Sequence, residues 1–331
     1  MKVCIYGAGA IGGWIGAHLA QQGCSLSAVA RGATLEALQQ NGLVLLQGGQ
    51  EMRTSLVARE NPADLGVQDL VIVAVKAPAM ADVARRIGPL IGPNTVVLTA
   101  MNGVPWWFFH GLAPAYASMQ LQCIDPDGRI SAAMAPSRVV GCVTHLSAAT
   151  PQPGVVRHIA GNRLILGEPA GGADTARAGA IVEALRKAAF EVDEARSIQQ
   201  EIWFKLWGNM TVNPISALTG ATGDRILDDA RVRAFMSRCM LEAAAIGARV
   251  GLPIDADPES RHAGTRQLGA FRTSMLQDVE SGKQVELDAL VGAVLEIGRQ
   301  VEVPTPNLDA LFGLAGLQAR VRGLYGPPAV G

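Results

Sequence analysis

The chain begins with a short apolar strand that runs directly into a glycine-rich turn. In "MKVCIYGAGAIG" the residues Gly7, Gly9 and Gly12 are spaced as G-x-G-x-x-G, and a helical pattern follows until Gly23. In such a unit the first glycine permits a tight turn, the second lets the backbone approach a pyrophosphate, and the third lets the helix pack on the strand. The unpaired N–H groups at the start of the helix also attract phosphate. The sequence therefore predicts a nucleotide-binding βαβ unit, and the alternative is a glycine turn without a ligand.

Further apolar runs in the first half of the chain indicate an open sheet. Residues 25–31, 69–76 and 94–102 are predicted strands with helical segments between them, and continuous apolar runs are typical of parallel strands covered on both faces. Between about residues 139 and 168 the pattern changes, and short strands separated by Pro/Gly turns are expected to extend the sheet, at residues 138–148, 154–160 and 162–168. We therefore predict an α/β domain over residues 1–195 with a Rossmann-type, doubly wound sheet.

The rest of the chain has a different periodicity. After about residue 195 the strand patterns stop, and apolar residues recur at helical spacing. We therefore expect a second, all-α domain over residues 196–331. Its expected helices cover residues 197–218, 228–250, 258–281, 286–301 and 308–322.

Composition narrows the class of partner. Hydrophobic residues make up 49% of the 331 residues and charged residues 17%, which supports large buried cores rather than disorder. The formal net charge is -1 and no run of Lys or Arg occurs, so we do not expect nucleic acid or an anionic membrane as a partner. The apolar run at residues 70–75 is too short to span a bilayer.

The cysteines and histidines argue against a metal site. The five cysteines are scattered without paired spacing, and no H-E-x-x-H occurs among the five histidines. An odd, unpatterned set of cysteines fits reduced thiols, and the N-terminus lacks the form of a signal peptide. We therefore expect a cytoplasmic protein without a bound metal.

Polar residues follow three of the predicted strands. Arg31 stands where NAD-dependent enzymes usually carry Asp or Glu, and a guanidinium suits the 2′-phosphate of NADP. Lys76 and Asn102 each end an apolar strand, at the edge where open α/β sheets bind ligands. We expect Lys76 to meet a phosphate or ribose, and Asn102 a ribose or the nicotinamide. The alternatives are a solvated surface arginine and two ordinary polar residues at strand exits.

The segment "EIWFKLWGNMTVNP" carries a polar stripe on an otherwise apolar helix. At 100° per residue Lys205, Asn209 and Asn213 lie at 0°, about 40° and about 80°. A buried amine without a partner is costly, so the stripe is expected to face something polar, such as a substrate in the cleft between domains. Pro214 favours a kink near the stripe. The alternative is a face of the helix that points to solvent.

Taken together, these residues resemble the ketopantoate reductase family (2-dehydropantoate 2-reductases) over nearly the whole chain. The resemblance rests on "GAGAIG", Arg31, "VKAPAM", "MNGV", "KLWGNMTVNP" and "TSMLQDVESGKQVELDAL". It implies a 6-phosphogluconate dehydrogenase-like fold, with a Rossmann domain and a helical domain. It also implies reduction of 2-dehydropantoate by NADPH to (R)-pantoate, a step toward pantothenate and coenzyme A.

The resemblance also implies roles for single residues. Lys205 would be the general acid, Asn209 and Asn213 would hold the substrate, and Ser274 would bind its carboxylate. Glu286 would accept a hydrogen bond from a substrate hydroxyl, and Asn102 would lie between substrate and nicotinamide. The cofactor would contact Gly7, Ala8, Gly9, Ala10, Ile11, Gly12, Arg31, Lys76, Asn102, Ser147 and Glu286. Helix-capping roles are the alternatives for Ser274 and Glu286.

Two departures from the family pattern keep other functions open. Gly223 stands near the place of a third asparagine, and residues 106–109 ("WWFF") are unusually aromatic. Either could favour a different 2-oxo acid, although the aromatic residues could simply pack one domain on the other. A β-hydroxyacid dehydrogenase and a non-catalytic NADP-binding protein are further alternatives. We expect a small 2-oxo acid as the substrate, and a homodimer is conceivable.

Overall fold

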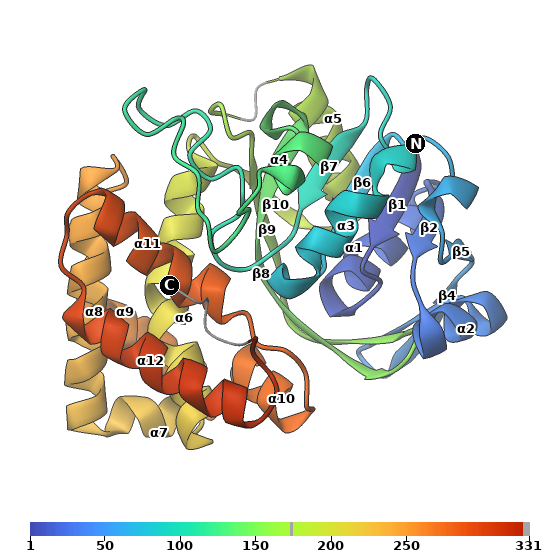
Figure 1. Cartoon of the computed structure of the whole chain (residues 1–331). Helices are drawn as coiled ribbons and strands as arrows, with labels where there is room; N and C mark the ends of the chain where they lie inside the picture. Colours follow the sequence, from blue (N-terminus) through green and yellow to red (C-terminus); the bar gives the residue numbers. More distant parts are fainter. Residues whose placement is uncertain (173–174, 327–331) are drawn as a thin grey trace. The chain divides into compact units, whose positions relative to one another are not determined.

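The computed structural model describes residues 1–172 and 175–326, which form two compact units (Figure 1). The sheet unit comprises Met1–Met101 and Asp127–Glu201, and the helical unit comprises Asn102–Pro126 and Ile202–Gly331. The change of unit at Glu201 lies a few residues beyond the boundary predicted at 195. The segment Asn102–Pro126, which the sequence patterns left in the first domain, is grouped with the helices.

One mixed sheet forms the centre of the sheet unit. Its strand order is β4-β3-β9-β8-β7-β6-β1-β2-β5, with β10 paired to β9. The strands from β5 to β8 in this order run parallel, as the βαβ pattern predicts, so the predicted α/β fold is confirmed. The strands are β1 Lys2–Tyr6, β2 Ser25–Val29, β3 Leu43–Gln47, β4 Gln50–Thr54, β5 Val57–Arg59, β6 Leu70–Val73, β7 Val96–Thr99, β8 Val139–Gln152, β9 Val155–Gly167 and β10 Glu191–Glu194.

The longest strands differ from the prediction. Residues 154–160 and 162–168 were expected as separate strands, but they belong to the single strand β9, which pairs antiparallel with β8. Gly161, which reads as a break in sequence, has φ +75°, and its backbone packs directly against the carbonyl of His145 on β8. The glycine therefore permits a close approach within a continuous strand instead of ending it.

Short helices cover the sheet. The close packing of the first of them on β1 depends on glycine: a Cβ on Gly12 would lie 2.8 Å from Cγ2 of Ile5 and would strike the carbonyl oxygen of Gly7. This is the role that the sequence assigns to the third glycine of the motif. The helices of the unit are α1 Ala10–Gln21, α2 Gly32–Asn41, α3 Met80–Arg86, α4 Arg129–Ala133 and α5 Ala176–Lys187, with 3-10 turns at Pro62–Asp64, Ala77–Ala79, Gly88–Leu90 and Pro136–Arg138.

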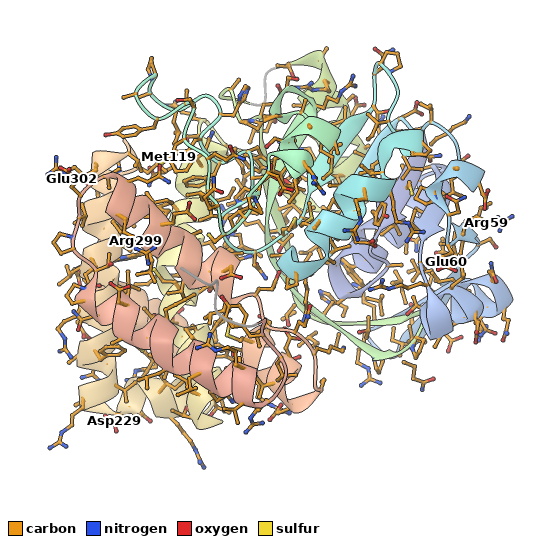
Figure 2. All side chains as sticks on the ribbon, in the orientation of Figure 1. Arg59, Glu60, Met119, Asp229, Arg299 and Glu302 are labelled. Atoms are coloured by element: carbon orange, nitrogen blue, oxygen red, sulfur yellow. The ribbon has the colours of Figure 1, made fainter. Side chains whose placement is uncertain are left out.

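Helices build the second unit, where α8 and α12 pack against each other (Figure 1). The first turn of α8 is capped by Asp229, labelled in Figure 2, whose carboxylate accepts from the N–H groups of Arg231 and Val232. The helices are α6 Ile198–Thr219, which joins the two units, α7 Gly223–Asp228, α8 Ala230–Arg249, α9 Pro258–Arg266, α10 Ser274–Glu280, α11 Ala293–Gln300 and α12 Pro306–Val321, with a π-helical turn at Asp288–Gly292.

Three features of these helices depart from the sequence patterns. The single helix predicted over 258–281 is wrong, because α9 ends at Arg266 and α10 begins at Ser274. The short helix α7 was not predicted, and the predicted helix over 286–301 starts with the π turn. None of the helices within 1–172 and 175–326 is both long and apolar enough to cross a bilayer.

Replacing Gly12 with alanine is expected to destabilise the sheet unit by about 1–3 kcal/mol, because the added methyl has no room between Gly7 and Ile5. Gly179 is the matched control: it lies inside α5 with no heavy atom near its missing Cβ, so Gly179→Ala should be neutral or stabilising by up to about 1 kcal/mol. Urea unfolding of both variants measures the difference. Equal effects would contradict the steric explanation.

Candidate active site

The glycine loop is shaped by close contacts at its ends and open space in its middle. Gly7 has φ +99°, and a Cβ there would lie 2.7 Å from Cγ1 of Val75. Gly9, in contrast, has no heavy atom within 4 Å of its missing Cβ. It is also the N-cap of α1, without a side-chain cap and without an acidic residue in the first turn. The start of α1 therefore presents unpaired N–H groups next to open space, as an anion site requires.

Two basic residues lie near this loop in the sheet unit. The ends of β1, β6 and β7 are in register at Tyr6, Val73 and Thr99, which brings the segment before Lys76 against the glycine turn. Lys76 is partly buried and starts a 3-10 turn. Arg31 follows β2 as the N-cap of α2, with an exposed side chain. The predicted placement of both at the carboxyl edge of the sheet is therefore compatible with the strands.

Ser147 lies at an irregularity in the β8–β9 pairing. The register shifts on both sides of it, between His145 and Ser147 and again between Ser147 and Ala148. Such bulges leave backbone groups without ladder partners and occur often beside functional sites. Ser147 itself is paired with Ala160, and Leu146 is the residue of β8 that the register skips, so the predicted cofactor contact of Ser147 stays a prediction.

Lys205 and Asn102 meet in the helical unit. The Lys205 ammonium donates a hydrogen bond to Oδ1 of Asn102, with Nζ and Oδ1 2.9 Å apart. The lysine is partly buried on α6, where its neighbours Leu206 and Trp207 are only 2% and 1% exposed. An amide acceptor offsets part of the cost of placing an ammonium in apolar surroundings.

The polar stripe of α6 continues with Asn209 and Asn213. The helix is continuous through Pro214, so the three side chains share one face as the spacing predicts. Asn209 is partly buried and Asn213 is only 6% exposed. The alternative of a stripe that points to solvent therefore fails at Asn213.

Ser274 and Glu286 lie at the starts of two helical segments. The cap of α10 is Thr273, whose hydroxyl accepts from the N–H of Leu276, so the capping alternative for Ser274 is wrong. Ser274 is exposed as the first residue of the helix. Glu286 is partly buried and comes just before the helical residues that lead into the π turn, so its capping alternative stays open.

Gly223, which stands near the place of the family's third asparagine, packs against the ring of Phe271. A Cβ on Gly223 would overlap the ring of Phe271, and the Gly223 N–H donates to the Phe271 carbonyl at 2.9 Å. Phe271 lies three residues before Ser274. An apolar ring therefore occupies the space that a side chain at position 223 would need.

The aromatic segment belongs to the helical unit. Residues 107–109 are buried, and the ring of Phe108 lies 5.9 Å from that of Trp203 between centroids. The longer segment Asn102–Pro126, which includes the labelled Met119 in Figure 2, is also held by Glu296. The Glu296 carboxylate accepts from the backbone N–H groups of Gln122 and Cys123 at 2.6 and 3.0 Å. Sequence reasoning missed Glu296 because its partners are backbone groups more than a hundred residues away.

Burial limits the reactivity of two of the cysteines. None of the five cysteines forms a disulfide, and burial raises the pKa of the Cys4 thiol to about 11 and that of Cys239 to about 12. Such thiols stay protonated at neutral pH and are poor nucleophiles. Within 1–172 and 175–326, no group of three or more His, Cys, Asp or Glu could hold a metal ion.

Comparison with known proteins matches both parts of the chain to one family. The family described as ketopantoate reductase PanE/ApbA matches residues 3–171, and its C-terminal counterpart matches residues 197–318. The chain belongs to the ketopantoate reductase family. A 2-dehydropantoate 2-reductase of Mesorhizobium japonicum is 44% identical over 98% of this chain and 100% of its own length.

Solved structures agree with this family. A protein from Ralstonia solanacearum MolK2, provisionally described as a ketopantoate reductase, is 54% identical to this chain, with a TM-score of 0.94. The match covers 98% of this chain and 99% of that chain. A D-mandelate dehydrogenase solved with NADH and anilino(oxo)acetate is 21% identical with a TM-score of 0.83, covering 98% of this chain and 100% of its own. At that identity the second likeness concerns the fold alone.

Substituting Thr273 and Ser274 one at a time separates the cap from its neighbour. Thr273→Ala should lower the free energy of unfolding by about 0.5–2 kcal/mol, because α10 loses its capping hydroxyl. Ser274→Ala should change it by less than about 0.5 kcal/mol, because its exposed hydroxyl is not the cap. Chemical denaturation measures both, and a larger loss for Ser274→Ala would refute this assignment.

Proposed function

We propose that this chain reduces 2-dehydropantoate to (R)-pantoate with NADPH, and that Lys205 is the proton donor. Family membership and the 44% identical relative of the same length support the reaction. The hydrogen bond from Lys205 to Asn102 on an otherwise apolar helix carries the assignment of the proton donor. It places an ammonium group, oriented by an amide, on the face of α6 that also bears Asn209 and Asn213.

The residues of the glycine loop fit a dinucleotide. Open space at Gly9 and the uncapped start of α1 would receive the pyrophosphate beside Ala8, Ala10 and Ile11. Lys76 would contact phosphate or ribose, and the backbone of Ser147, at the irregular part of the β8–β9 pairing, would contact the cofactor. Arg31 is exposed at the end of β2, where its guanidinium would bind a 2′-phosphate through charge-assisted hydrogen bonds. This last contact is the reason to propose NADPH over NADH.

Reduction of a ketone requires one hydride and one proton. Reduced nicotinamide supplies the hydride to the carbonyl carbon when it is bound. The Lys205 ammonium would donate a hydrogen bond to the carbonyl oxygen, stabilise the negative charge that develops there, and transfer a proton as the alkoxide forms. Asn102 would keep Nζ in place for this transfer, since its Oδ1 already accepts a hydrogen bond from the ammonium group.

Four polar residues would hold the substrate. Asn209 and Asn213 lie on the face of α6 that carries Lys205, and each of these residues is about one helical turn from the next. The Ser274 hydroxyl, which is not the cap of α10, would bind the carboxylate. Glu286 would accept from the substrate hydroxyl and contact the cofactor. The homodimer and the cytoplasmic location expected from the sequence stay predictions.

The reaction is tested by the loss of NADPH absorbance when ketopantoate is added to the purified protein, with NADH run in parallel. Rapid oxidation of NADPH, and slow oxidation of NADH, is the expected result. Oxidation of neither coenzyme with ketopantoate would overturn the proposed substrate.

A second candidate is a reductase of a different 2-oxo acid, favoured by one observation. The ring of Phe271 takes the space next to Gly223, where an amide would offer polar contacts. An apolar group there would suit a larger apolar substituent on the acid, because burying it would leave no polar group unpaired. A panel of 2-oxo acids with NADPH distinguishes the two. A specificity constant for an aryl or branched acid well above that for ketopantoate would favour this second function.

Lys205→Ala should lower kcat by about 10²–10⁴-fold while the binding of NADPH changes little, because the proton donor is lost and the glycine loop is untouched. Turnover is measured by NADPH absorbance, and binding by quenching of protein fluorescence. Lys187→Ala, which removes an exposed lysine of α5, is the control and should keep the wild-type rate. Unchanged turnover in Lys205→Ala would remove this residue from the mechanism.

Arg31→Ala should weaken the preference for NADPH over NADH by about 10- to 100-fold, since a charge-assisted contact to phosphate is worth about 1.5–3 kcal/mol. The measured quantity is the ratio of kcat/KM with the two coenzymes. Arg53→Ala, at another exposed arginine of the sheet unit, should leave that ratio unchanged. The same ratio in wild type and Arg31→Ala would contradict the 2′-phosphate contact.

A further inference from the structure

The backbone next to Asn102 comes unusually close to another helical segment. Gly103 has φ +81°, and a Cβ there would lie 2.5 Å from the carbonyl oxygen of Ala289 and 2.8 Å from its Cβ. The nearest two atoms belong to the backbone of Ala289 and the third is its Cβ, so none of them can swing aside as the end of a long side chain can. Only glycine fits this position without moving one chain away from the other.

The close approach is made to a π-helical turn. Residues Asp288–Gly292 form this turn, in which the N–H of Ala293 donates to the carbonyl of Asp288. The carbonyl of Ala289 within the same turn accepts from the N–H of Val104 at 2.9 Å. Single π turns recur at functional sites, because their irregular ladder directs backbone groups outside the helix. Here the turn binds the chain directly after Asn102.

The segment of residues 102–126 is attached near its other end as well, to the helical residues that follow the π turn. Glu296, about one turn beyond the π turn, accepts from the N–H groups of Gln122 and Cys123, and the amide of Gln300 donates to the carbonyl of Gln120 at 3.3 Å. The segment is thus fixed at both ends to residues 288–300. Its first anchor lies next to the residue that accepts the hydrogen bond from Lys205.

We propose that Gly103 is a positioning residue, whose contact with Ala289 holds Asn102 where it accepts the Lys205 hydrogen bond. This inference rests on the proposed roles of Lys205 and Asn102. Ordinary contact distances begin at 3.4 Å, so a methyl group on residue 103 would push the two backbones apart by about an ångström. The 2.9 Å hydrogen bond between Nζ and Oδ1 does not survive such a displacement, because contacts beyond about 3.5 Å are no longer hydrogen bonds.

The test compares Gly103→Ala with the same substitution at Gly251, a glycine with a similar positive φ. Gly251 has φ +83° in the same unit, and no heavy atom lies within 4 Å of its missing Cβ. Gly251→Ala therefore places an alanine at a similar positive φ without the collision. Gly103→Ala should lower kcat by about 10- to 100-fold with KM for NADPH within about twofold, whereas Gly251→Ala should keep the wild-type kcat.

A double-mutant cycle separates positioning from general destabilisation. If Gly103 acts through Asn102, then Asn102→Ala combined with Gly103→Ala should have the kcat of Asn102→Ala alone, within about twofold. Multiplied losses in the double variant would overturn the proposal. Should Gly103→Ala fail to fold, Val104→Pro removes the N–H donor to Ala289 without adding a methyl at 103, and the same cycle applies.

A structural readout keeps this inference distinct from the proposed function. In a crystal structure of Gly103→Ala the distance from Nζ of Lys205 to Oδ1 of Asn102 should exceed about 3.5 Å. A distance that stays at 2.9 Å would refute the positioning role even if the wild-type enzyme reduces ketopantoate. A lengthened distance would support it even if wild type reduces no 2-oxo acid, in which case only the proposed function fails.

Discussion

The Lys205 ammonium lies among apolar side chains of α6 and therefore requires a hydrogen-bond acceptor. Contacts around this acceptor connect several segments of the helical unit. Asn102 provides the acceptor for Lys205, although the two residues are 103 positions apart in the sequence. Asn102 in turn depends on the backbone contact of Gly103 and Val104 with Ala289. The burial of Trp203 against Phe108 and the carboxylate of Glu296 hold the rest of that segment. The cost of placing the partly buried ammonium in apolar surroundings is thus lowered by Asn102, which contacts from several elements hold in place.

Local patterns were sufficient for much of the fold. Strand, glycine turn and helix at the N-terminus follow from short-range sterics, which is why the parallel core of the sheet and α1 were predicted. The stripe of Lys205, Asn209 and Asn213 followed from helical geometry alone, and α6 contains all three. The single β9, the gap between α9 and α10, and the π turn were not predictable in this way. They depend on pairing and packing with residues distant in sequence, which local propensity does not encode.

The candidate site divides in the same way. Its polar side chains were proposed from the sequence because they interrupt apolar patterns or match a family motif. The contacts that hold them were not found, because Ala289 offers a backbone carbonyl and Gln122 and Cys123 offer backbone N–H groups, which have no signature in the side-chain sequence. The strand that ends at Thr99 suggested a sheet-domain place for Asn102, whereas the aromatic residues after it are buried with the helices. A run of buried aromatics after an Asn-Gly pair was the one available signal for this segment.

The membership of Asn102–Pro126 in the helical unit has a consequence for synthesis on the ribosome. This segment leaves the ribosome between two stretches of the sheet unit, and Glu296 is made 173 residues after Cys123. At roughly 5–20 residues per second, about 9 to 35 seconds pass before that anchor exists. The ring of Trp203, which packs on Phe108, is also made only after the last residue of the sheet unit, Glu201. The aromatic side chains of residues 107–109 therefore wait for their helical partners while the sheet unit is synthesised, and transiently exposed apolar surface of this kind favours aggregation.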